Sequence, residues 1–99
     1  MVLNYTVQQV SSTTNLSTFI DTVFITAADA TVNINLPAIA ANGQRYLMKR
    51  VDSTDNGVYI IPNGSDTVGG SSSQFISNGQ VIELVSFDGN WEYTQNLAL

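Results

Sequence analysis

Apolar and polar residues alternate along short segments of the chain, and this pattern is typical of half-buried β-strands. The clearest case is Thr31–Leu36, in which Val32, Ile34 and Leu36 would face one side of a sheet. Pro37 ends this strand, because proline has no N–H to donate to a neighbouring strand. The same reasoning predicts strands at these further segments: Asn4–Val10, Thr18–Thr26, Arg45–Asp52, Val58–Ile61, Gln74–Ser77, Gln80–Asp88 and Asn90–Gln95.

Turn signals separate these segments. Asn-Gly pairs occur at residues 42–43, 56–57, 63–64 and 78–79, and an Asp-Gly pair occurs at 88–89. Such pairs tolerate the positive φ of tight hairpin turns. Val, Ile and Thr supply 28 residues, whereas Leu, Lys and Glu supply 10, so strand formers dominate and no helix is predicted. We therefore expect an all-β single domain over residues 1–99, a jelly-roll-like β-sandwich or barrel of about eight to nine antiparallel strands.

The first eighteen residues are mostly polar and carry no charged side chain. Two interpretations of residues 1–18 remain open. Tyr5, Val7 and Val10 would belong to an ordinary edge strand of the same domain. Alternatively, the segment is a strand or arm that contacts a neighbouring subunit by adding to an exposed sheet edge.

Charge and composition exclude several classes of protein. Three basic and eight acidic residues give a net charge of −5, which argues against a nucleic-acid partner. The chain has no cysteine and no histidine, which removes disulfides, thiol catalysis and imidazole chemistry. No stretch reaches the roughly 18 apolar residues of a membrane span. Residues 1–6 resemble no signal peptide, and we expect no membrane partner, no metal and no cofactor.

The segment Asp52–Gly57 superficially resembles a calcium-binding loop. A true EF-hand loop needs a glutamate at its twelfth position, where this chain has Asn63. Asp and Asn are also the residues that turns prefer, so we interpret the segment as a turn.

Charged side chains offer two further candidate sites. Glu83 and Glu92 could face each other across the last hairpin as an acid–base pair. Each lies mid-strand, however, where a solvent-facing polar residue is ordinary. Arg45, Lys49 and Arg50 share one predicted strand, but Lys49 and Arg50 point to opposite faces. The three therefore do not predict a phosphate site, and the chain is not expected to be an enzyme.

Trp91 and Tyr93 lie on the same face of the last strand. If exposed, they would form a platform on which a sugar could stack. If buried, they would anchor the core. Glu92 between them marks the opposite face as the wet one, so we expect both rings to be buried.

The segment Val58–Ile61 is apolar on both faces, and Val81–Phe87 is nearly so. The core of a two-layer domain covers only one face of each sheet. The other face needs a second cover, most simply a neighbouring copy of the chain, although a central strand at a barrel corner would give the same pattern. We predict a subunit interface formed by the following residues: Tyr59, Ile61, Val85 and Phe87.

The order of motifs along the chain resembles that of bacteriophage fibre and virion-surface β-domains, over about residues 20–95. The motifs are residues 31–37 (Thr-Val-Asn-Ile-Asn-Leu-Pro), 43–49 (Gly-Gln-Arg-Tyr-Leu-Met-Lys), 51–52 (Val-Asp), 58–61 (Val-Tyr-Ile-Ile), 62–68 (Pro-Asn-Gly-Ser-Asp-Thr-Val), 70 (Gly), 81–86 (Val-Ile-Glu-Leu-Val-Ser) and 88–91 (Asp-Gly-Asn-Trp). Residues 5–7 resemble the usual first strand of these domains. The resemblance implies a jelly-roll-like or sandwich knob, commonly trimeric and displayed outside a virion.

The function that this resemblance implies is structural. We expect a homotrimeric capsid decoration or cement protein on the outer capsid surface, made in the host cytoplasm, that binds the major capsid protein and stabilises the shell. The alternatives are the knob of a phage fibre, which sits on a stalk and binds a host receptor or glycan, and a carbohydrate-binding module. No stalk sequence precedes the domain here, which favours a decoration protein. Receptor contacts in such domains lie in variable loops, so no binding residue is carried over.

Overall fold

Ten short strands and no helix make up the described part of the chain. The computed structural model describes residues 7–18, 22–39 and 41–97. The strands are β1 (Val7–Val10), β2 (Thr14–Asn15), β3 (Thr22–Ile25), β4 (Val32–Asn35), β5 (Arg45–Arg50), β6 (Val58–Ile61), β7 (Thr67–Val68), β8 (Gln74–Phe75), β9 (Val81–Phe87) and β10 (Asn90–Leu97). The prediction of an all-β domain is confirmed for these residues. The two-residue strands β2 and β7 lie outside the segments that the sequence pattern predicts as strands.

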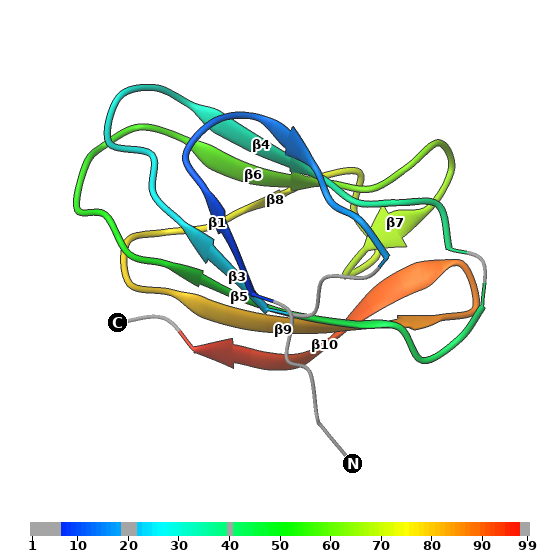
Figure 1. The fold of residues 1–99 in the computed structure, drawn as a ribbon. Coiled ribbons are helices and arrows are strands. Elements are labelled where there is room, and N and C mark those ends of the chain that lie inside the picture. The colour runs from blue at the N-terminus through cyan, green and yellow to red at the C-terminus, as the bar shows by residue number, and fades with distance from the viewer. Residues whose placement is uncertain (1–6, 19–21, 40, 98–99) are drawn as a thin grey trace, which may run out of the picture.

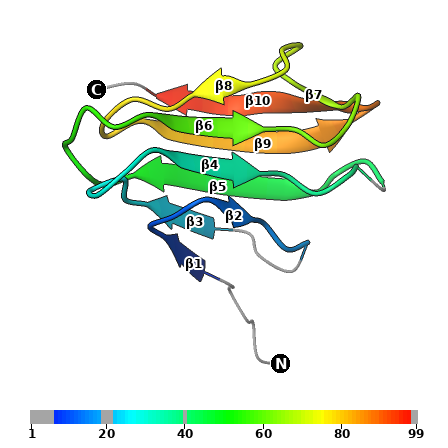
Figure 2. The same cartoon turned by 90° about the horizontal axis from the view of Figure 1, so that it is seen from above.

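The strands form two sheets that face each other (Figure 1). The six-stranded sheet has the order β1-β3-β5-β9-β10-β7, and the four-stranded sheet has the order β2-β4-β6-β8. Seen from above, β4 lies over β5 and β6 lies over β9 (Figure 2). The core therefore fills the space between two layers, and each sheet keeps one outward face.

The first six strands wind as a short β-solenoid. The chain passes from one sheet to the other after every strand, so that β1, β3 and β5 pair in parallel in one sheet and β2, β4 and β6 pair in parallel in the other. The expectation of a jelly roll with antiparallel strands is wrong for this half of the chain. Apolar alternation predicts which side chains point inward, but it is the same in parallel and antiparallel strands.

The last strands run back and close one end of the solenoid. Strand β8 pairs with β6, β9 with β5, and β10 with β9, all antiparallel. The turn between β9 and β10 has φ of 53° at Asp88 and 78° at Gly89, which confirms the hairpin predicted there. The antiparallel prediction therefore holds for these three strand pairs, whereas the short strand β7 pairs with β10 in parallel.

The core contains the apolar residues that the alternation assigned to the inner faces. Val32, Ile34 and Leu36 are buried, as expected for Thr31–Leu36. Val10 and Leu16 are buried in the same core, so the described part of residues 1–18 packs on its own domain, with β1 at the edge of the six-stranded sheet. Contact of this segment with a neighbouring subunit stays a prediction, and residues 1–6 lie outside the described residues.

Candidate functional site

A buried ion pair organises one end of the domain. Arg50, the last residue of β5, points inward, and its guanidinium forms two hydrogen bonds to the carboxylate of Asp52, with Nε 3.0 Å from Oδ1 and Nη2 3.1 Å from Oδ2. Such two-point contact is the strongest form of an arginine–carboxylate pair. A cation buried to this degree needs this kind of partner, because an unpaired charge is costly away from water.

Backbone groups complete the environment of this pair. Arg50 also donates to the carbonyl oxygens of Ile76 at 2.9 Å, Thr54 at 3.2 Å and Asn56 at 2.5 Å. Asp52 accepts from the backbone N–H groups of Ala27 and Thr54 and from the Thr54 hydroxyl. The nearby guanidinium holds the pKa of Asp52 well below its usual range.

The chain therefore bends in the segment that begins at Asp52, and both carboxylate oxygens of Asp52 accept hydrogen bonds from other groups of the protein. This agrees with the interpretation of the segment as a turn rather than a calcium loop. Within residues 7–18, 22–39 and 41–97, no group of three or more acidic side chains lies close enough together to hold a metal ion.

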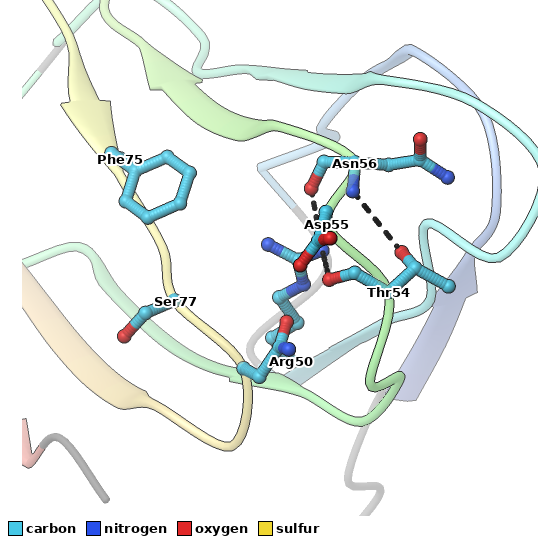
Figure 3. Close-up of a pocket in the computed structure, with 7 residues that line it drawn as sticks. Arg50, Thr54, Asp55, Asn56, Phe75 and Ser77 are labelled. Carbon is cyan, nitrogen blue, oxygen red and sulfur yellow. Dashed lines mark hydrogen bonds between the residues drawn. The ribbon is translucent and has the colours of Figure 1, made fainter.

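Two shallow hollows flank the Arg50 end. We call the first the Phe75 hollow; it has a volume of about 350 Å³ and is shown in Figure 3. It is lined by Arg50, Thr54, Asp55, Asn56, Phe75, Ser77 and Asn78. The second hollow, of about 380 Å³, is lined by Lys49, Arg50, Val51, Asp52, Ser53, Asn78 and Gly79. In Figure 3 the Phe75 ring stands opposite the loop that carries Asp55 and Asn56.

The outer face of the six-stranded sheet, which we call the A face, is unusually apolar for a solvent-facing surface. Its apolar members, by strand alternation and register, are Val7, Phe24, Leu47, Val81, Val85, Phe87 and Leu97. Phe87 and Leu97 are 59% and 60% exposed. Single exposed apolar residues are ordinary, but several on one sheet face indicate a binding surface.

Charges on the A face balance. Arg45 and Lys49 point outward from β5, and Glu83 and Glu92 point outward from β9 and β10. Arg45 lies 3.5 Å from Glu83 in an exposed ion pair. The face is therefore neutral although the whole chain carries −5, so two copies could meet there without net repulsion.

The outer face of the four-stranded sheet, which we call the B face, has a different chemistry. None of its strand residues is charged. One cross-strand row contains Asn33, Tyr59 and Phe75, and the next contains Asn15, Asn35 and Ile61. Asn35 Nδ2 donates to Asn15 Oδ1 at 2.9 Å, and the rings of Tyr59 and Phe75 lie 5.7 Å apart at 59°.

The structure does not bring the four predicted interface residues together. Tyr59 and Ile61 lie on the B face, whereas Val85 and Phe87 lie on the A face, on the opposite side of the domain. The doubly apolar segments belong to two different sheets, which the sequence alone does not reveal. A contact between subunits at either pair stays a prediction, but one continuous patch cannot contain all four.

The remaining candidates have separate surroundings. Glu83 accepts from the Thr94 hydroxyl at 2.6 Å and pairs with Arg45, whereas Glu92 accepts from Asn90 Nδ2 at 2.7 Å. In the β9–β10 register Glu92 lies opposite Val85, so the two carboxylates do not face each other. The basic residues of β5 do not converge either, because Arg50 alone points into the core.

The two aromatic residues of β10 both contact the core. Trp91 is fully buried, with its ring 5.4 Å from that of Tyr46, and Tyr93 packs against the core, where burial raises the pKa of its hydroxyl. The expectation of burial is confirmed for Trp91, whereas Tyr93 is half-buried; because the Trp91 ring is inaccessible, the two rings form no sugar platform. The exposed aromatic pair is Tyr59 and Phe75 instead. The sequence signal for the B face was the alternation of Asn33 and Asn35 with the buried residues of β4.

No protein-family model matches this chain, and no curated protein is significantly similar to it. The resemblance to phage β-domains therefore stays a prediction that depends on the motifs. In the part of the chain that the structure describes, no helix is long and apolar enough to cross a membrane.

Proposed function

We propose that this chain is a structural β-domain of a bacteriophage virion, which assembles as a homotrimer and decorates the outer capsid surface. The A face is the observation that carries this proposal. It joins exposed apolar side chains to a balanced set of charges, whereas the chain as a whole is acidic. Exposed apolar area of this kind is stabilised when another protein surface covers it.

A closed trimer requires two different patches on each subunit, because a threefold interface is heterologous. The A face supplies two such patches, one on each side of the central strand β5. Val7 and Phe24 lie on β1 and β3, and Val85 and Phe87 lie on β9. A trimer in which each A face turns toward the threefold axis would bring one patch against the other patch of the next subunit.

The B face is the less suitable surface for this trimer. Contacts between the A face of one copy and the B face of the next would join opposite sides of the domain. Repeated, such contacts build an open stack rather than a closed ring. We therefore assign the subunit contact to Val85 and Phe87 and leave Tyr59 and Ile61 outside it.

The partner of the trimer in this proposal is the major capsid protein, and the role is to add buried contact area across neighbouring capsid subunits. Light scattering on the purified chain tests the assembly step, and we expect a mass of three times 10.7 kDa. The number of copies in purified particles tests the capsid step, since a decoration protein is present in far more copies than a fibre knob. A monomer in solution, or a fibre-like copy number, would contradict the corresponding step.

A further inference from the structure

We propose that the Phe75 hollow and the neighbouring Tyr59–Phe75 pair bind a neutral oligosaccharide. This site goes beyond the proposed role in assembly and lies away from the A face, so either proposal can fail without the other. Phe75 connects the two parts of the site, because its ring lines the hollow (Figure 3) and also packs at a tilt against Tyr59 on the B face.

The Tyr59 ring is held in place by its neighbours. A Cβ atom on Gly57 would lie 2.6 Å from Tyr59 Cε2, so the ring occupies the space that the missing side chain of Gly57 leaves. Phe75 packs on the same ring at 5.7 Å between centroids. Tyr59 is nevertheless 37% exposed and Phe75 46% exposed. A ring fixed before binding loses little conformational entropy when a ligand stacks on it.

Aromatic rings of this kind suit the apolar face of a sugar. The C–H groups on one side of a pyranose ring carry partial positive charge, and the face of an aromatic ring carries partial negative charge. Tyrosine also presents a hydroxyl that donates or accepts a hydrogen bond at the rim of the stacked ring.

Polar groups for the sugar hydroxyls lie beside the rings. Asn33 is the cross-strand neighbour of Tyr59, and within the described residues its side-chain amide makes no hydrogen bond. The exposed side chains of Asp55 and Asn78 line the hollow together with Ser77. Amide groups both donate and accept and a carboxylate accepts twice, which matches the adjacent hydroxyls of a sugar.

The charges around the hollow favour a neutral ligand. Asp52 neutralises the guanidinium of Arg50, which leaves the carboxylate of Asp55 as the unpaired charge among the residues that line the hollow. The chain carries −5, so a phosphorylated or acidic glycan would be repelled. The volume of about 350 Å³ lies at the lower end of the range for small-molecule sites, which suits a few sugar units.

The experiment is binding of the labelled full chain to an array of neutral bacterial-surface oligosaccharides, with Tyr59→Ala, Phe75→Ala and Gly57→Ala beside the unchanged protein. We expect oligosaccharides that bind the unchanged protein to bind each variant about tenfold or more weakly. Gly57→Ala keeps both rings in the chain, but its methyl group fills the space that the Tyr59 ring occupies and so displaces the ring. Val51→Ala, at an exposed apolar residue outside both the A face and the Phe75 hollow, is the control and should bind normally. Thermal unfolding of each variant shows that it is folded.

Three outcomes would overturn the proposal. The first is that no neutral oligosaccharide binds, and the second is that binding is unchanged in Tyr59→Ala and Phe75→Ala. The third is that these two variants change the mass measured by light scattering, which would make the B face an interface between copies of this chain. If Phe87→Asp loses the trimer but still binds the sugar, the result supports the subunit contact on the A face and leaves the oligosaccharide site unaffected.

Discussion

Arg50 and Asp52 form a two-point ion pair in which the side chains are only 1% and 4% exposed. Both residues flank the point at which the chain leaves β5, so the pair connects the six-stranded sheet to the loop that leads into β6. The hydrogen bonds of Arg50 to the carbonyls of Thr54, Asn56 and Ile76 extend this connection to the segment after β8. The pair therefore shapes the wall of the Phe75 hollow.

Replacing Asp52 by Ala should destabilise the domain strongly, because the charge of Arg50 would stay buried without its partner. We expect the free energy of unfolding to fall by about 3–5 kcal/mol. Urea denaturation followed by tryptophan fluorescence measures this change. Asp55→Ala, three residues away and exposed, is the matched control and should change stability by at most about 0.5 kcal/mol. Equal stability of the two variants would show that the ion pair does not hold this end together.

The same pair predicts how stability depends on acid. The folded pKa of Asp52 lies well below the value of about 3.9 expected in the unfolded chain. Its contribution is therefore fully present above about pH 4 and decreases as pH falls toward the folded pKa, because the unfolded chain binds the proton first. Urea midpoints measured from neutral pH downward should fall less steeply for Asp52→Asn than for the unchanged protein. Parallel curves would contradict this prediction.

Tyr46 predicts a loss of stability in alkali. Burial raises the pKa of its hydroxyl from 10.0 to about 12, and the hydroxyl donates to the backbone carbonyl of Ser17 at 2.9 Å. Because the folded pKa is raised, this contribution is present below about pH 10 and is lost as pH rises toward about 12.

Tyr46→Phe tests this prediction. The variant should lose about 1 kcal/mol near neutral pH, because it lacks the hydrogen bond, and its stability should depend less on pH above about 10. Thermal unfolding at a series of alkaline pH values provides the measurement. An identical alkaline profile in both proteins would show that another group controls unfolding there.

Replacing Phe87 by Asp should dissociate the proposed trimer, because a charge placed in an apolar contact is costly without a partner. Phe87 is 59% exposed in the single chain, so the substitution should leave the fold intact. Light scattering and circular dichroism measure the two effects separately. Phe75→Asp, the same change on the B face, should leave the trimer unchanged. If the trimer survives Phe87→Asp but is lost in Phe75→Asp, the interface lies on the B face and this prediction is wrong.

Local patterns in the sequence were sufficient to predict the longer strands and their inward residues, but not the two-residue strands β2 and β7. Val32, Ile34 and Leu36 are buried as expected, since strand alternation depends only on neighbouring residues. The hairpin at Asp88 was also predictable, because the turn requires positive φ at residues that tolerate it. The inward direction of Trp91 and Tyr93 followed from Glu92 on the opposite face, although Tyr93 is only half-buried.

Only the tertiary structure decided which strands pair and in which direction. Parallel and antiparallel strands share the same alternation, so the solenoid winding of β1 to β6 was not readable from it. The sequence placed Lys49 and Arg50 on opposite faces but did not show which one turns inward. Arg50 is buried among Asp52, the nearby backbone carbonyls of Thr54 and Asn56, and the carbonyl of Ile76, which is distant in the chain. Tyr59 and Phe87 lie on opposite sides because their strands belong to different sheets. These outcomes depend on contacts between residues far apart in the chain, which no local pattern contains.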